Sequence, residues 1–357
     1  MAISMHTTTR TKTRTQVARA GLVLALTLPL ALGACGRKDD ADEFREGVPY
    51  HEDVALVIPG GSTQQSALHA GEVTEVQAKL LGEQAELYKL TRAITVMVNG
   101  GTVAVLTLVR TITDFPPSSV GMDVAVWGPH TNPLSPNTWR LTVNRVAKGQ
   151  FSYVFEAKPK TADDAAYLTI LSGHHNVANP GMRRRARVAA FGSGDFDINW
   201  DNAQMLPEHD ANVGRAHFVY SRPSPGSEVN IAVTFTQVKD DETDMLIDAQ
   251  YGYAETPGMG GNFQFTLSKD AIVTTAALET LTVRSRWQET GAGRSDVKYA
   301  GGDVAATVGA PEATASECWD SNFLSVYQTN SYMDAAKMWG AVTDCDSAFA
   351  APDYAVF

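Results

Sequence analysis

Apolar and polar residues alternate with a period of two from about residue 120 onward. The alternation recurs in about ten segments, which polar or glycine-rich turns such as 258–261 separate. Successive side chains of a strand point to opposite faces, so this pattern predicts strands with one apolar and one hydrated face. Because the connections are short, we expect consecutive strands to pair antiparallel.

Before the strands, apolar residues recur with a longer period. They recur there at spacings of three, four or seven, at Val73, Val76, Leu80, Leu87, Leu90 and Ile94. This spacing predicts a helix over 62–98, which Ser62 and Gln65 could begin as a capping box. The glycines in 99–101 predict a turn. Residues 103–112 then either complete a helical hairpin, which we favour, or form a strand.

These patterns together predict a mainly β fold with α structure at the N-terminus. A long antiparallel meander packs on an N-terminal helix or helical hairpin, and buries its apolar face as a curved half-barrel, a closed barrel or a sandwich. No helical pattern interrupts the strands, so a parallel α/β sheet is excluded. The 62–98 helix could pack on its own domain or, by its heptad-like spacing, on a partner coiled coil.

Composition and charge narrow the class of protein. The chain has 357 residues, of which 44% are hydrophobic and 19% charged, with a formal net charge of −11. This apolar content is that of a folded protein rather than a disordered one. The first 34 residues hold four basic residues and no acid, so the rest is more acidic still. Such a surface repels phosphate backbones, which excludes nucleic acid as a partner.

The N-terminus has the features of an export signal. A basic segment precedes an apolar run over 21–32, which is too short to cross a bilayer about 30 Å thick. The run ends in Leu32-Gly33-Ala34-Cys35, which resembles the bacterial lipobox. That resemblance implies cleavage before Cys35 and acylation of its thiol, with palmitate among the acyl chains. Gly36 follows, which fits sorting to the outer membrane.

We therefore divide the chain into five parts. We expect a signal peptide over 1–34, a lipidated acidic tether over 35–58 and a helical segment over 59–118. An antiparallel β domain over 119–317 and a C-terminal extension over 318–357 follow. The membrane is thus the first predicted partner, through the lipid on Cys35.

The other two cysteines are expected to close the C-terminal extension. Export places Cys318 and Cys345 in an oxidising compartment, where an even number of cysteines usually pairs. A disulfide over a loop of this length contributes roughly 3.5 kcal/mol in the chain-entropy treatment.

Motifs for chemistry are sparse. Neither a phosphate-binding loop, nor a nucleophile elbow, nor a zinc-protease helix is present in the sequence. The acids in 195–201 resemble the front half of a calcium loop, but Trp200 and Leu206 stand where an EF-hand needs Gly and Glu. His174 and His175 are adjacent, so on a strand they point to opposite faces and rarely reach one ion. We predict no catalytic residue, no metal site and no cofactor.

Two charge clusters have ordinary explanations. Asp240, Asp241, Glu242 and Asp244 suit a solvated hairpin turn. The basic cluster over 183–187 suits the hydrated face of a strand and its turn, although it could also contact anionic headgroups.

Several short stretches, most of them in the C-terminal third, resemble outer-membrane lipoproteins of myxobacteria and their relatives. These phrases are Ser285–Gln288, Thr290–Asp296, Gly301–Asp303, Glu317–Asp320 and Tyr220–Pro223. The resemblance covers the lipobox and about 120–320, and implies no activity and no catalytic residue. We expect the arginines and acids of these phrases to form strand-to-turn ion pairs, and Trp319 to cover a sheet end beside the disulfide.

These observations predict a non-catalytic lipoprotein anchored to the outer membrane. Its curved sheet would bind a lipid or another hydrophobic ligand, and the candidate lining residues are Trp139, Phe151, Tyr153, Phe155, Phe235, Tyr251, Phe263 and Phe265. The simpler interpretation is that the same residues form the hydrophobic core of the β domain. Alternatives are a structural, adhesion or protein-interaction module with an envelope partner, and an envelope hydrolase whose site is assembled from distant residues.

Overall fold

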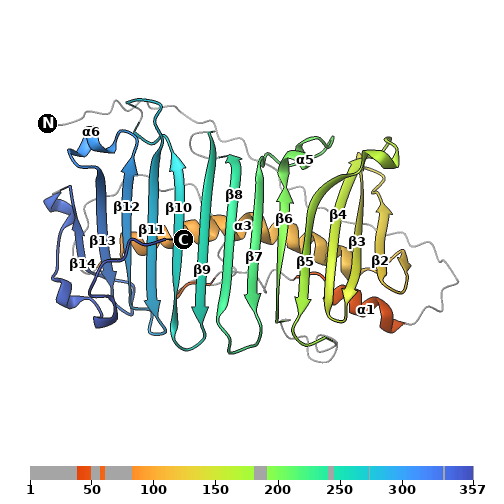
Figure 1. Ribbon diagram of the computed structural model, residues 1–357, viewed down its shortest axis with the longest axis horizontal. Helices are drawn as coiled ribbons and strands as arrows, with labels where there is room; N and C mark the ends of the chain where they lie inside the picture. Colours follow the sequence, from red (N-terminus) through yellow and green to blue (C-terminus); the bar gives the residue numbers. More distant parts are fainter. Residues whose placement is uncertain are drawn as a thin grey trace. The chain divides into compact units, whose positions relative to one another are not determined.

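A single antiparallel sheet dominates the computed structural model (Figure 1), which describes residues 38–49, 57–60, 83–180, 191–239, 245–272, 274–332 and 334–356. Within these residues the sheet has 14 strands in sequence order, and each strand pairs with its neighbour in the chain. The strands are β1 (Ser119–Val120), β2 (Val124–His130), β3 (Asn137–Ala147), β4 (Gln150–Pro159), β5 (Leu168–Val177), β6 (Gly192–Asn199), β7 (Arg215–Arg222), β8 (Val229–Lys239), β9 (Leu246–Thr256), β10 (Gly260–Lys269), β11 (Glu279–Gln288), β12 (Gly293–Gly301), β13 (Glu312–Trp319) and β14 (Ser325–Asn330). The described pairings do not join β1 to β14, so the sheet is open. The predicted mainly β meander is confirmed.

Helices are few among the described residues. They are α1 (Lys38–Glu46), α3 (Glu86–Asp114), α5 (Trp200–Gln204) and α6 (Val304–Val308), with short 3-10 turns η1 (Asp164–Ala166), η2 (Ala335–Lys337), η3 (Val342–Asp344) and η4 (Ser347–Phe349). All described residues belong to the unit 38–357.

Helix α3 runs across the strands on one face of the sheet (Figure 1). Near its start, Thr91 lies within 2.6 Å of Ser285 on β11. Past its end, the Phe115 carbonyl accepts a hydrogen bond from the indole of Trp127 on β2. The helix therefore covers the sheet from its last strands to its first.

The predicted turn at 99–101 is wrong, because α3 continues through Asn99-Gly100-Gly101 without a break. Each glycine disfavours a helix by about 1 kcal/mol relative to alanine. Buried apolar side chains on both sides of this point, such as Val98 and Leu106, offset that penalty. Residues 103–112 thus belong to the same helix and are not a separate hairpin arm. Of the predicted 62–98 helix, residues 61–82 lie outside the described part.

The predicted tether is also partly helical. Residues 38–46 form α1, whose Phe44 is only 1% exposed and packs edge-on against Phe151 at 6.2 Å. The side chain of Arg45 donates to the carbonyl of Thr113 at the end of α3. The many acids of this stretch predict a solvated tether. In the structure, Phe44 packs it against the sheet and Arg45 bonds it to the end of α3.

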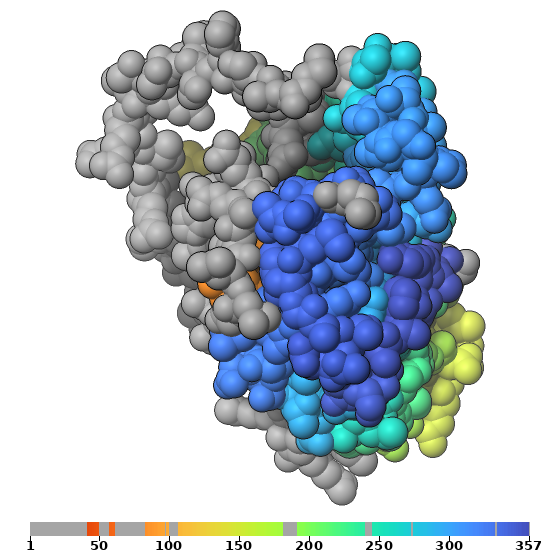
Figure 2. Space-filling view, turned by 90° about the vertical axis from the view of Figure 1, so that its left-hand side faces the viewer, coloured from red at the N-terminus to blue at the C-terminus, as the bar shows by residue number. Residues whose placement is uncertain are grey.

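The chain ends in a strap, residues 346–356, across the face opposite α3. On β12, Ser295 points toward α3, so its neighbours Arg294 and Asp296 point the other way. There Arg294 donates to the carbonyl of Phe349, and Asp296 accepts from the amide of Asp353. Figure 1 shows this segment in front of the sheet with α3 behind, and Figure 2 shows the C-terminal residues, in dark blue, gathered over the β14 end.

The C-terminal extension therefore differs from its prediction in one respect. The β structure does not stop at 317, because β13 continues to Trp319 and β14 follows as a further strand. The disulfide Cys318–Cys345 is present, with 5.5 Å between the Cα atoms. It joins β13 to the start of the strap.

Candidate functional site

Three parallel rows of side chains cross the face of the sheet that contacts α3, which we call the inner face. Directly paired residues of neighbouring strands point to the same face, so the register defines each row. The central row contains Tyr153, Gly173, Phe196, Phe218, Val233, Tyr251 and Phe265. The two flanking rows contain Phe151, His175, Gly194, Tyr220, Ile231, Tyr253 and Phe263, and Phe155, Leu171, Ile198, Ala216, Phe235, Ala249 and Leu267.

These rows contain seven of the eight aromatic residues predicted to line a ligand site. The eighth, Trp139, lies on β3 with its ring centroid 6.4 Å from that of Phe155. Trp139 and Phe235 are partly buried. The other six, Phe151, Tyr153, Phe155, Tyr251, Phe263 and Phe265, are at most 6% exposed. All eight belong to one hydrophobic core. The predicted common apolar face is therefore present, and ligand binding by these residues stays a prediction.

Glycines on the inner face make room for tyrosine hydroxyls. A Cβ at Gly173 would lie 2.7 Å from the Tyr153 hydroxyl, and one at Gly194 would lie 2.6 Å from that of Tyr220. Each tyrosine thus lies over the backbone of a neighbouring strand, Tyr153 over β5 and Tyr220 over β6. Tyr220 also hydrogen-bonds the buried His175 at 2.6 Å.

The hydroxyl of Tyr153 is buried without a hydrogen-bond partner in the described structure. Burial raises the pKa of Tyr153 well above its usual value, and the negative charges of Asp195 and Asp197 raise it further. The phenol is therefore a neutral donor and acceptor. A buried polar group without a partner disfavours the folded state by about 1–3 kcal/mol, so a polar atom of a ligand would stabilise it.

Toward the last strands one inner row becomes polar. It continues from Phe263 into Ser285, Ser295 and Glu317. The Ser285 hydroxyl donates to that of Ser295 at 2.9 Å. Glu317 accepts the backbone N–H of Leu87, in the first turn of α3, at 2.6 Å.

Glu317 is fully buried, and burial raises its pKa above the usual 4.5. Hydrogen bonds from the backbone of Leu87 and from Ser325 act in the opposite direction, and the nearby charge of Glu86 adds to the rise. No local pattern predicts the position of Glu317, because the pairing of β10 to β13 brings it to the start of α3. The sequence analysis singled out Glu317 only as part of the Glu317–Asp320 stretch.

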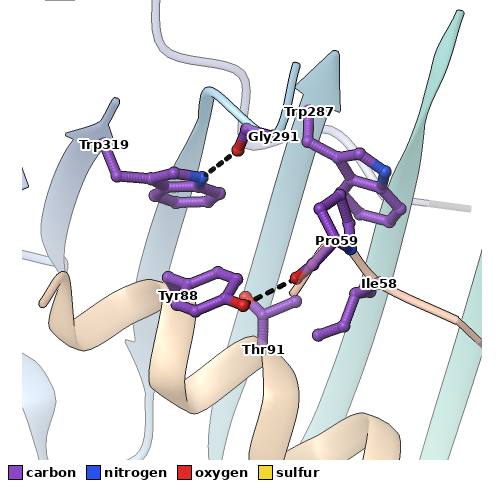
Figure 3. Close-up of a pocket in the computed structure, with 7 residues that line it drawn as sticks. All are labelled: Ile58, Pro59, Tyr88, Thr91, Trp287, Gly291 and Trp319. Carbon is purple, nitrogen blue, oxygen red and sulfur yellow. Dashed lines mark hydrogen bonds between the residues drawn. The ribbon is translucent and has the colours of Figure 1, made fainter. Parts of the chain in front are cut away.

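A small pocket adjoins this polar row (Figure 3). It is lined by Ile58, Pro59, Tyr88, Thr91, Trp287, Gly291 and Trp319. Tyr88 donates to the Pro59 carbonyl at 2.6 Å, and the indole of Trp319 donates to the Gly291 carbonyl at 2.9 Å. The enclosed space is about 10 Å³, which is enough for one water. This pocket contains none of the eight predicted lining residues.

The opposite, outer face carries two exposed pairs of histidine and aspartate. His174 of β5 contacts Asp195 of β6 at 3.2 Å, and His217 of β7 contacts Asp197 at 2.8 Å. His174 and His175 thus point to opposite faces, as predicted. Among the described residues, no group of three histidine, cysteine or acidic side chains is arranged to hold a metal ion.

The other two polar residues of the calcium-like stretch, Asn199 and Asp201, have structural partners. Asn199 accepts the amide of Asn202 at the start of α5, and Asp201 accepts the amide of Gly214. The acids over 240–244 and the arginines over 183–187 lie outside the described residues, as does Cys35.

The arginines and acids of the C-terminal phrases pair between β11 and β12 and within β12, rather than from strand to turn. Arg286 of β11 and Arg294 of β12 both contact Asp296, at 2.9 and 2.7 Å. Arg284 reaches the strap through Asp353 at 3.4 Å. Trp319 is buried at the end of β13, next to Cys318, as expected.

Comparison of the chain with protein-family models, with curated proteins and with solved structures finds no match. Within the described residues, none of the helices has both the length and the hydropathy needed to span a bilayer.

Proposed function

We propose that the protein is a non-catalytic lipoprotein, anchored to the outer membrane through Cys35, whose inner face holds a hydrophobic ligand beneath α3. The central row crosses seven strands, and six interstrand spacings of about 4.8 Å give about 29 Å of apolar surface. This is about twice the length that one acyl chain covers in a bilayer leaflet, given a hydrocarbon core about 30 Å thick.

The observation that carries the proposal is the nature of the cover over this surface. Among the described residues, helix α3 rather than a second sheet crosses these rows, and Phe44 of α1 and Ile58 pack into the same core beside it. Hydrogen bonds attach α3 to the sheet at both ends, through Glu317 near its start and Trp127 past its end. Movement of α3 would expose the aromatic rows without breaking the pairings among strands β1–β14. The Tyr153 hydroxyl would then offer a hydrogen bond to a polar atom of the ligand.

Native mass spectrometry with lipid extraction tests this function. The chain from Gly36 onward is incubated with phosphatidylethanolamine and with a long-chain fatty acid. A stoichiometric apolar adduct is the expected result. A clean mass without adduct contradicts ligand binding.

A disulfide lock tests whether α3 is the cover. The hydroxyl oxygens of Thr91 and Ser285 are 2.6 Å apart, so cysteines at both positions are close enough to bond. The oxidised Thr91→Cys, Ser285→Cys variant should bind a fluorescent fatty acid several-fold more weakly than either single variant. Equal binding by all three would show that α3 does not need to move.

The lipid anchor has its own test. Cys35→Ser should leave the signal peptide uncleaved and the protein without lipid, because the acylated thiol is lost. Metabolic labelling with palmitate that still marks this variant contradicts the anchor.

The close packing around α3 favours a second candidate, a structural or protein-interaction module of the envelope. The pocket beside the polar row has room for only one water, so a ligand at that place needs a rearrangement that a docking module does not. A clean native mass together with a cross-linked envelope protein would favour this candidate.

A further inference from the structure

The fold begins almost immediately after the predicted lipid. Helix α1 starts at Lys38, three residues after Cys35, and three residues extend over at most about 11 Å. Phe44 and Arg45 fix α1 to the sheet and to the end of α3. If Cys35 carries the anchor, the part of the fold around α1 must therefore stay close to the bilayer.

One arginine connects α1 to two neighbouring hairpin tips. Arg145, at the end of β3, contacts Glu43 of α1 at 2.8 Å and Asp123 of the β1–β2 turn at 3.1 Å. It also donates to the backbone carbonyl of Met122. The residue after it, Val146, is the second-last residue of β3, directly before the Lys148-Gly149 turn to β4. In Figure 1, α1 lies at this end of β3 and β4.

These two tips expose large apolar side chains. Met122 is 82% exposed and Val146 is 67% exposed. Lys148, in the turn that follows β3, is exposed as well. We call these three residues the tip surface.

The acids beside the tip surface have cationic partners. Glu43 and Asp123 pair with Arg145, and Asp42 pairs with Arg45 at 2.5 Å. The two arginines offset two of these three negative charges, which reduces the local repulsion from anionic headgroups. Exposed aliphatic side chains next to a lysine suit the boundary between headgroups and acyl chains.

We propose that the tip surface rests on the bilayer that holds the lipid of Cys35, as a second membrane contact. The proposal rests on the lipid anchor of the proposed function. One acyl anchor with an additional contact binds a membrane more firmly and, unlike a flexible tether, sets the orientation of the domain. The sheet would then stand with its β1–β2 and β3–β4 turns toward the lipid.

Spin labels on the full lipidated chain test this orientation. With Cys35 acylated and Cys318 bonded to Cys345, a cysteine introduced at Met122 or Val146 is the single free thiol. The matched control is a label at Leu134, which is 94% exposed in the β2–β3 turn, at the other end of β2 and β3. The protein is reconstituted in vesicles of phosphatidylethanolamine and phosphatidylglycerol. Collision rates with oxygen and with a water-soluble nickel complex are then measured.

We expect the oxygen-to-nickel ratio to be several-fold higher at Met122 and Val146 than at Leu134. Equal ratios in a chain that floats with the vesicles overturn the docking and leave the anchor in place. Labels at Met122 and Val146 that are shielded from both reagents overturn it in favour of a protein contact. A chain that does not float overturns the anchor, and this proposal with it.

Discussion

Glu317 of β13 caps α3 by accepting the backbone N–H of Leu87 at 2.6 Å, across 230 positions of sequence. Ala85 occupies the N-cap position and makes no side-chain hydrogen bond to the helix. The first N–H groups of a helix have no partner within it, and a carboxylate there also interacts favourably with the helix dipole. The sheet therefore supplies the cap that the local sequence lacks.

Replacement of Glu317 by alanine should lower the free energy of unfolding by about 2 kcal/mol. The change leaves the partly buried amide of Leu87 without its acceptor. Urea unfolding followed by circular dichroism measures the loss. Glu312→Ala is the control, because Glu312 is exposed on the same strand and should change stability by less than about 0.5 kcal/mol. Equal losses in the two variants would contradict the capping function.

The raised pKa of Glu317 predicts a specific pH dependence of stability. The folded state holds this proton to a higher pH than the unfolded state, whose value is near the usual 4.5. The favourable contribution is therefore complete below about pH 4.5 and is lost as pH rises through the folded pKa. Glu317→Gln has no such titration, so the wild-type protein should lose stability relative to this variant over that interval.

Urea unfolding of both proteins at a series of pH values measures this difference, and the other titrating groups cancel in it. A difference that stays constant with pH, or that grows in favour of the wild-type protein as pH rises, would contradict the buried state of this carboxylate.

The strands could be predicted from the sequence because their signal is local. A period of two marks each strand, and a short turn such as Lys148-Gly149 makes the next strand its neighbour. The cap on α3 could not be predicted, because it depends on the register of four strands from Phe263 to Glu317. The helix through Asn99-Gly100-Gly101 was missed for a related reason, since its stabilisation comes from tertiary burial rather than from propensity.

His174 and His175 should differ sharply in their effect on stability. His175 is fully buried and bonded to Tyr220, so His175→Ala should cost about 3 kcal/mol through a cavity and a lost hydrogen bond. His174 is exposed and its partner Asp195 is solvated, so His174→Ala should cost less than about 1 kcal/mol. Thermal and urea unfolding of the two variants checks the prediction. Similar losses would mean that the register of β5 is shifted.

The candidate site shows the same division between local and distant information. Alternation identified the eight aromatic residues as one apolar face, and the structure places them in one core. What covers that face depends on α3, which precedes the strands and whose glycines suggested a turn. The burial of charge on the outer face was hidden in the same way, because the sequence predicts ion pairs for Arg286, Arg294 and Asp296 but not that the strap packs over them.

Asp296 should be the most sensitive of these charged residues. It contacts Arg286, Arg294 and the amide of Asp353 from a fully buried position. Asp296→Asn leaves two guanidinium groups without their carboxylate, so we expect a loss of about 3 kcal/mol. Because one of these arginines holds the strap at Phe349, the amides of residues 349–356 should also exchange hydrogen faster.

The matched control is Asp197→Asn on β6, where the aspartate and its partner His217 are both exposed. This variant should lose less than about 1 kcal/mol and leave exchange in the strap unchanged. If Asp296→Asn destabilises the protein but the strap exchanges at its original rate, the disulfide to Cys345 rather than the arginine network holds the strap in place. If neither quantity changes, the strap does not depend on this charge network at all.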